Sequence, residues 1–161
     1  MAQVKTAAEA VDGWYVVTTS RRTGSAVEQG LSERLSRDPR CRLLLLATRD
    51  PLNGTMEGML GCADVAVVTG ESISMVSEAC ASGRRVVVVE PPLRHAHASS
   101  LTKHQRFLRQ LVEGGYVRGA PVPEVGLALQ RLLKARPPAK RLDNAAIVRN
   151  ALIKLLGFSS V

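Results

Sequence analysis

Aromatic residues make up only 3% of this 161-residue chain, and they are too few to form a stacking platform for single-stranded nucleic acid. The 22 Lys and Arg outnumber the 14 Asp and Glu, and the resulting net charge of +8 favours anionic partners. These basic residues are scattered along the chain, so nucleic-acid binding would rest on charge alone. We therefore expect no nucleic-acid partner. A nucleotide, an anionic membrane surface or an ordinary solvated surface are the alternatives.

Long hydrophobic runs are also missing, because the longest apolar stretches are too short to span a bilayer. The first ten residues lack an apolar signal core and include an acidic residue, which argues against secretion. We expect a cytoplasmic location, with peripheral attachment to a membrane as an alternative.

The chain has three cysteines and three histidines, so few side chains are available for metal sites or nucleophilic catalysis. Cys41, Cys62 and Cys80 lie in apolar segments, as reduced core cysteines of cytosolic proteins do. His95 and His97 could ligate a metal, but no third ligand is readable, and two ordinary loop histidines are the alternative. No Ser/His/Asp or Cys/His set is readable either. We predict no metal and no cofactor.

Buried strands alternate with helices along the whole chain, which we interpret as one domain over residues 1–161. The pattern predicts strands over residues 14–19, 42–47, 65–69 and 86–89, and helices over 2–11, 25–37, 56–62, 102–113, 125–134 and 144–156, with one more between Ser72 and Gly83. We expect Val27, Leu31 and Leu35 to form the apolar face of the 25–37 helix. Such alternation is typical of an α/β fold: a Rossmann-like, doubly wound parallel sheet with helices on both faces, in which the second and third strands flank the first.

The junction between the third strand and the next helix is the strongest candidate site. At this edge of a parallel sheet, the free amides and the dipole of a helix N-terminus attract phosphate. Gly70 allows a tight turn and close backbone approach. Residues with hydroxyl and carboxylate side chains flank Gly70 in the sequence. We expect Ile73 to face the sheet, and Glu71 to share a ligand-facing side of the helix with Ser74 and Glu78. The predicted diphosphate-binding residues here are Thr69, Gly70, Glu71, Ser72, Ser74 and Glu78.

A second candidate group follows the first strand. In the common doubly wound order, the loop Ser20, Arg21, Arg22 and Thr23 would face the loop after Thr69 across one crevice. Two arginines opposite a helix N-terminus would make a clamp for a diphosphate. The alternative is that both arginines cap or salt-bridge the surface.

Two motifs together resemble a known family. The segments Ser20-Arg-Arg-Thr23 and Val68-Thr-Gly-Glu-Ser-Ile-Ser-Met-Val-Ser-Glu-Ala79, followed by Gly83, are similar to those of the mitochondrial fission (elongated-mitochondria) family. Weaker similarity continues to Leu156. Glu71 stands where this family usually has Asp, a longer arm with the same charge.

The resemblance implies the C-terminal domain of a GT-B glycosyltransferase-like protein, the half that binds a nucleoside diphosphate or nucleotide sugar. Glu78 would then bind ribose hydroxyls, and the Gly70–Ser74 loop would hold the diphosphate. A GT-B enzyme also needs an N-terminal acceptor domain, which we expect to be missing here, so this chain alone should catalyse no sugar transfer. The alternative is a non-catalytic module at membranes, in which the basic helix with Lys103, Arg106 and Arg109 contacts anionic lipid.

Overall fold

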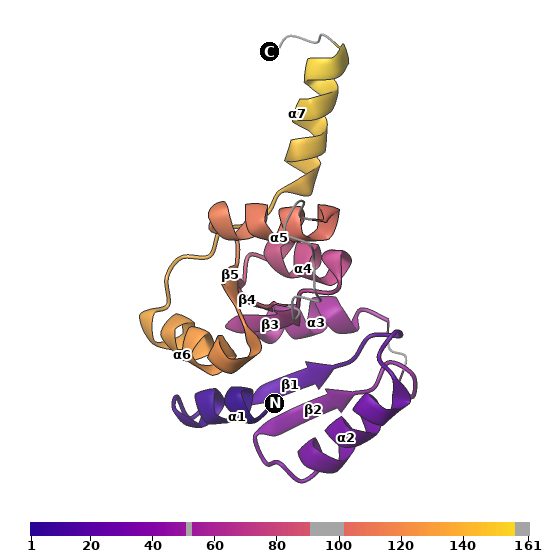
Figure 1. Ribbon diagram of the computed structural model, residues 1–161, viewed down its shortest axis with the longest axis vertical. Coiled ribbons are helices and arrows are strands. Elements are labelled where there is room, and N and C mark those ends of the chain that lie inside the picture. Colours follow the sequence, from indigo (N-terminus) through magenta and orange to yellow (C-terminus); the bar gives the residue numbers. More distant parts are fainter. Residues whose placement is uncertain (51–52, 91–101, 157–161) are drawn as a thin grey trace. The chain divides into compact units, whose positions relative to one another are not determined.

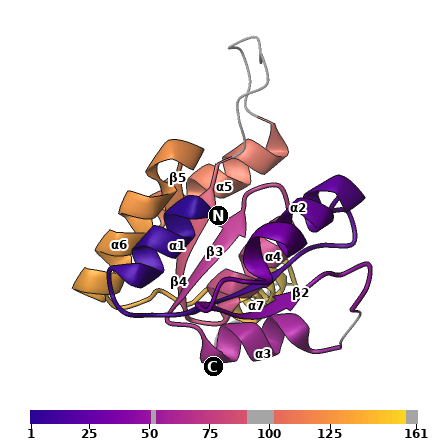
Figure 2. The same ribbon diagram turned by 90° about the horizontal axis from the view of Figure 1, so that it is seen from below.

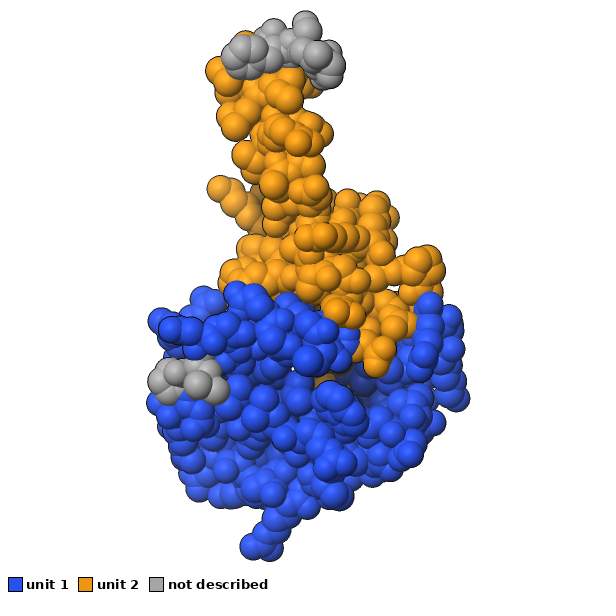
Figure 3. Space-filling view, turned by 180° about the vertical axis from the view of Figure 1, so that it is seen from behind, with its two compact units in different colours: residues 1–63, 123–136 blue, residues 64–122, 137–161 orange. Residues whose placement is uncertain are grey.

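The computed structural model describes residues 1–50, 53–90 and 102–156. The chain divides into two compact units (Figure 3). Unit 1 comprises residues 1–63 and 123–136, and unit 2 comprises residues 64–122 and 137–161. The chain therefore passes from one unit to the other three times, and each unit contains segments that are distant in sequence.

Unit 1 is built on a pair of parallel strands, β1 (Tyr15–Thr18) and β2 (Cys41–Leu45), connected through α2 (Ser25–Leu35) (Figure 1). Its other helices are α1 (Ala2–Glu9), α3 (Thr55–Cys62) and α6 (Val125–Ala135). The pairing places Val17 opposite Leu44, and its register shifts between Tyr15 and Val16. Apolar side chains from α1, α2 and both strands pack into one cluster, namely Val4, Ala8, Tyr15, Val17, Leu31, Leu35, Cys41 and Leu44.

Helices α1 and α6 lie side by side within unit 1 although more than a hundred residues separate them (Figure 2). The amide of Gly126 donates a hydrogen bond to Oε1 of Gln3 at 2.7 Å. A Cβ added at Gly126 would lie 3.1 Å from Cβ of Gln3, so the missing side chain permits the close approach of the two helices. Val125, Ala128 and Leu129 are buried along the same helix.

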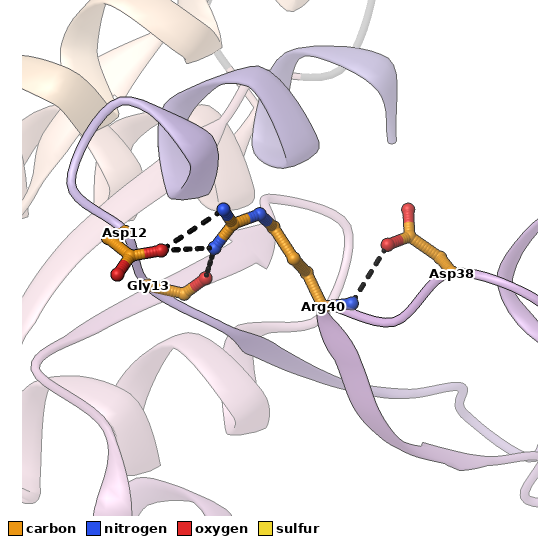
Figure 4. A network of polar contacts seen from close by, with 4 residues as sticks. All are labelled: Asp12, Gly13, Asp38 and Arg40. Carbon is orange, nitrogen blue, oxygen red and sulfur yellow. Dashed lines mark hydrogen bonds and ion pairs between the residues drawn. The ribbon is translucent and has the colours of Figure 1, made fainter.

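A polar network fixes the amino-terminal end of the β1–β2 pair (Figure 4). The guanidinium of Arg40 binds Oδ1 of Asp12 at 3.1 Å and the carbonyl of Gly13 at 2.8 Å. The amide of Arg40 donates to Oδ1 of Asp38 at 3.0 Å. Asp38 is buried and also accepts from the hydroxyl of Tyr15 at 2.9 Å, so this carboxylate connects the starts of the two strands.

Unit 2 contains three parallel strands in the order β3 (Val65–Thr69), β4 (Arg85–Val89) and β5 (Arg118–Ala120). The helix α4 (Ile73–Ala81) connects β3 to β4 and packs on both, and α5 (Lys103–Glu113) packs on β5. The core joins the valines of β4 to the buried face of α4, where Val76, Ala79 and Cys80 are fully inaccessible. Burial raises the pKa of the Cys80 thiol to about 11.

The helix α7 (Asn144–Leu156) follows a short segment that is attached to the end of α4. In that segment Nε of Arg141 donates to the carbonyl of Ala81 at 2.9 Å, and the amide of Leu142 donates to the carbonyl of Cys80 at 3.0 Å. None of the helices in the described ranges combines the length and the apolar character needed to span a bilayer.

The predicted α/β class is confirmed: parallel strands connected by helices form a Rossmann-like arrangement. The strand pairing differs from the expectation in one respect. The third strand, β3, is an edge strand beside β4, and β1 pairs with β2 in a separate two-stranded sheet. Neighbouring strands joined by one crossover helix pair readily, and both pairs here, β1 with β2 and β3 with β4, are of that kind.

Candidate functional site

The junction after β3 folds as the predicted strand, turn and helix. β3 ends at Thr69, and Ser72 is the N-cap of α4 with extended backbone angles of φ −112° and ψ 101°. Its hydroxyl accepts a long hydrogen bond of 3.5 Å from the amide of Met75 and lies 3.2 Å from the hydroxyl of Ser74. Ser72 is buried, and its hydroxyl serves as the structural N-cap of α4.

The peptide of Gly70 is held by the protein on both sides. Its amide donates to the carbonyl of Val89 at 2.8 Å, which extends the β3–β4 ladder by one residue. Its carbonyl oxygen is contacted by Nε2 of His104 on α5. The Gly70 amide is therefore unavailable to a phosphate. In the first turn of α4 the amide of Met75 is bonded to the hydroxyl of Ser72, which leaves those of Ile73 and Ser74 in that turn for an anion.

His104 is a residue of this site that the sequence did not reveal, because the pattern places it on the polar side of its helix. A carbonyl only accepts hydrogen bonds, so Nε2 of His104 must carry the proton toward Gly70. The one local signal is its position in the first turn of α5, which begins with a capping box between Thr102 and Gln105. That signal locates the start of the helix, but only the packing of α5 in the folded chain brings His104 to Gly70.

Two orientations differ from the prediction. Glu71 precedes the N-cap, so it does not share a helix face with Ser74 and Glu78. Ile73 is 41% exposed instead of facing the sheet, because a side chain in the first helical position projects toward the helix N-terminus and past the sheet edge. The remaining pair agrees with the prediction. Ser74 and Glu78 are both exposed and stand one turn apart on α4.

The Ser20–Thr23 loop in unit 1 is a compact turn closed by its own polar groups. The amide of Thr23 donates to the carbonyl of Ser20 at 2.9 Å, and the amide of Ser20 donates to Oγ1 of Thr23 at 3.0 Å. Arg21 and Arg22 are exposed, and neither forms an ion pair with any residue in the described ranges. The alternative of a surface salt bridge therefore has no partner there, and both guanidinium groups are free to meet an anion.

A buried carboxylate stands behind this loop. Glu28 of α2 is only 2% exposed, and its Oε1 accepts from the hydroxyl of Thr19 at 2.6 Å. Its Oε2 contacts the hydroxyl of Thr48. These hydrogen bonds, led by that of Thr19, hold the pKa of Glu28 below its usual value. Sequence reasoning missed Glu28 because a single glutamate in an amphipathic helix is ordinarily a surface residue.

The two predicted groups belong to different units. Ser20, Arg21, Arg22 and Thr23 lie in unit 1, whereas Thr69, Gly70, Glu71, Ser72, Ser74 and Glu78 lie in unit 2. Within unit 2, the turn and the first residues of α4 are brought together with His104. The approach of the two groups across one crevice stays a prediction.

In the described ranges, no three His, Cys, Asp or Glu side chains gather in a way that could hold a metal ion. His95 and His97 lie outside the described residues. All three cysteines are free. Cys80 is buried as predicted, but Cys41 is only half-buried and Cys62 is exposed, because Cys62 ends α3 beyond its one buried residue, Leu60.

A family model described as Mitochondrial fission ELM1 matches residues 1–154 of the chain. The match includes both candidate groups, His104 and Glu28. No curated protein and no solved structure matches the chain.

Proposed function

Because the chain belongs to the mitochondrial fission ELM1 family, we propose that it binds the diphosphate of a nucleoside diphosphate or nucleotide sugar at the start of α4. One observation carries the proposal. The turn before α4 is fixed by β4 and α5 through Gly70, while the first amides of α4 and the hydroxyl of Ser74 stand at the carboxyl edge of a parallel sheet. Pre-organised amides and a helix dipole favour an anion at such a position.

The sugar portion of the ligand would lie further along α4. Glu78 is exposed one turn beyond Ser74, so its carboxylate is available to accept hydrogen bonds from ribose hydroxyls. Arg21 and Arg22 of unit 1 would add positive charge toward the diphosphate. Of what the GT-B resemblance implies, the binding of the nucleotide is the part we assign to this chain.

A thermal-shift panel of UDP, GDP and ADP with their sugar conjugates tests the proposal. A ligand that binds only the folded chain stabilises it by about 2.7 kcal/mol at a hundred times its dissociation constant. We expect one base to shift the unfolding midpoint more than the other two. Inorganic phosphate and the corresponding free nucleosides are the controls. Absence of any shift with every diphosphate at millimolar concentration would reject the proposed function.

A second candidate function is attachment to an anionic membrane surface, and the exposed faces of unit 2 favour it. Lys103, Arg106 and Arg109 are exposed at successive three-residue intervals on α5. On α7, Leu152 and Leu155 are 49% and 81% exposed. Basic residues near an anionic bilayer contribute about 1 kcal/mol each. Sedimentation with phosphatidylserine vesicles, compared with phosphatidylcholine vesicles, tests this function, and equal sedimentation with both would reject it.

A further inference from the structure

We propose that Glu28 is a positioning residue, which through the hydroxyls of Thr19 and Thr48 holds the Ser20–Thr23 loop against the ends of β1 and β2, in the position that presents its two arginines. That this loop contacts a diphosphate rests on the proposed function above. The effect of Glu28 on the loop does not depend on that function, and it can be measured without any ligand.

The surroundings of Glu28 are unusual for a carboxylate. It is 2% exposed, yet no Lys, Arg or His in the described ranges forms an ion pair with it. A buried charge is costly unless hydrogen bonds compensate for the lost water. Here the compensation comes chiefly from two threonine hydroxyls, one on each carboxylate oxygen. The backbone amide of Thr48 and the charge of Arg49 also favour the ionised form. Hydrogen bonds from hydroxyls to an ionised acceptor are short and strong, and the 2.6 Å bond from Thr19 agrees with that.

Both threonines follow the strands of unit 1. Thr19 comes directly after β1 and immediately precedes Ser20, whereas Thr48 follows β2 by three residues. Oγ1 of Thr19 also accepts from the amide of Ala47 at 2.8 Å. Glu28 therefore connects α2 to both strand ends at the edge where parallel α/β proteins place their ligand-binding loops.

A neutral or apolar side chain would be a simpler solution if the only task were to fill the space under α2. A carboxylate also fixes the orientation of its partners, because each oxygen accepts a hydrogen bond from the threonine hydroxyl that follows one strand. Neither hydroxyl can rotate away without leaving the buried charge with fewer hydrogen bonds. The turn from Ser20 to Thr23 is closed by its own hydrogen bonds, so what Glu28 fixes is its attachment to the sheet through Thr19.

The first experiment measures the loop alone. Trypsin cleavage after Arg21 and Arg22 is compared with cleavage after Arg34 and Arg37, which are also exposed but lie at the other end of α2. Hydrogen exchange of the Ala47 amide, which is bonded to Oγ1 of Thr19, provides a second local reading. We expect Glu28→Gln to speed the loop cleavage and this exchange by about tenfold, because hydrogen bonds to a charged group are replaced by weaker ones.

Three variants make the test specific. Thr19→Val removes the hydroxyl at nearly constant shape and should act like Glu28→Gln, whereas Thr19→Ser keeps the hydroxyl and should behave like the wild type. Glu33→Gln is the matched control, since Glu33 is an exposed carboxylate on the same helix. If Glu28→Gln does not fold, the two Thr19 variants decide. Cleavage at Arg21 and Arg22 that is unchanged, or that rises only in proportion to cleavage at Arg34 and Arg37, would overturn the inference.

The second experiment adds the ligand. If UDP, GDP or ADP binds the wild type, Glu28→Gln and Thr19→Val should weaken that diphosphate's binding, and Thr19→Ser should restore it. A diphosphate affinity unchanged in both variants would overturn the role of the loop conformation in binding. If the wild type binds no diphosphate, the proposed function fails, while the cleavage and exchange measurements still decide whether Glu28 positions the loop.

Discussion

Nε2 of His104 contacts the carbonyl oxygen of Gly70, so the first turn of α5 is connected to the turn that precedes α4. The two residues are 34 positions apart, and both belong to unit 2. Gly70 is buried, and the imidazole supplies its carbonyl with a donor. This contact therefore stabilises the loop that we propose to hold a diphosphate.

Removing the donor of His104 should destabilise unit 2. His104→Phe leaves the buried Gly70 carbonyl without this partner, which costs about 1–3 kcal/mol, whereas His104→Gln can still donate and should cost less. Urea unfolding of both variants measures the difference. Gln110→Ala, on the exposed side of α5, should change the unfolding free energy by less than about 0.5 kcal/mol. Equal stability of the Phe and Gln variants would show that the His104 contact contributes nothing.

Acid should destabilise unit 1 through two buried carboxylates. The pKa of Glu28 is lowered mainly by the hydroxyl of Thr19, and that of Asp38 mainly by the ammonium of Lys5 at 2.9 Å. A folded pKa below the unfolded one means that each stabilising contribution is complete above the unfolded value, about 4.3 for Glu and 3.9 for Asp, and is lost as the pH falls through the folded pKa.

Thermal unfolding between pH 7 and pH 3 measures this loss. We expect the wild-type midpoint to fall steeply below about pH 4, and we expect Glu28→Gln and Asp38→Asn to start lower and fall less steeply. Glu33→Gln should follow the wild-type curve. A Glu28→Gln curve parallel to that of the wild type would mean that this carboxylate has the same pKa in both states.

The arginine pair should contribute to diphosphate binding through charge. Replacing both Arg21 and Arg22 by Ala is expected to weaken binding and to flatten its dependence on ionic strength, since exposed charges are screened within about 10 Å at 0.1 M salt. Titrations at low and high salt measure both effects. The double variant Arg34→Ala with Arg37→Ala removes the same charge elsewhere in unit 1 and is the control. If the two double variants have the same salt dependence, the attraction comes from net charge and not from the loop.

Much of the fold could be predicted because the strands are continuous apolar runs and the helices end at Gly or Pro. The strand β5, Arg118–Ala120, could not, because its three residues have no apolar pattern and become a strand only by pairing with β4, where Gly119 lies opposite Val88. The strand order could not be predicted from local sequence patterns either, because it depends on contacts between elements far apart in the chain.

The buried face of α2 shows how a side chain's surroundings can override periodicity. Val27, Leu31 and Leu35 have helical spacing, but Val27 is 57% exposed, and Glu28 occupies the buried position in its place. Residues 28, 31 and 35 fit one helix face equally well, so periodicity alone cannot choose between them. The choice is made by Thr19 and Thr48, whose hydroxyls accommodate a carboxylate. The candidate site was predicted where a motif was local, and it was missed at Glu28 and His104, where partners come from distant segments.

The proposed function is tested most directly by calorimetric titration of UDP, GDP and ADP into the wild type and into Glu78→Ala. Glu78 is exposed on α4, so its removal should not disturb the core, and Glu113→Ala on α5 is a control with the same loss of charge. We predict binding of at least one diphosphate that Glu78→Ala weakens by about 1.5–3 kcal/mol, the range for a hydrogen bond to a charged group, and that Glu113→Ala leaves unchanged. Binding of equal strength to the wild type and to Glu78→Ala would contradict the account.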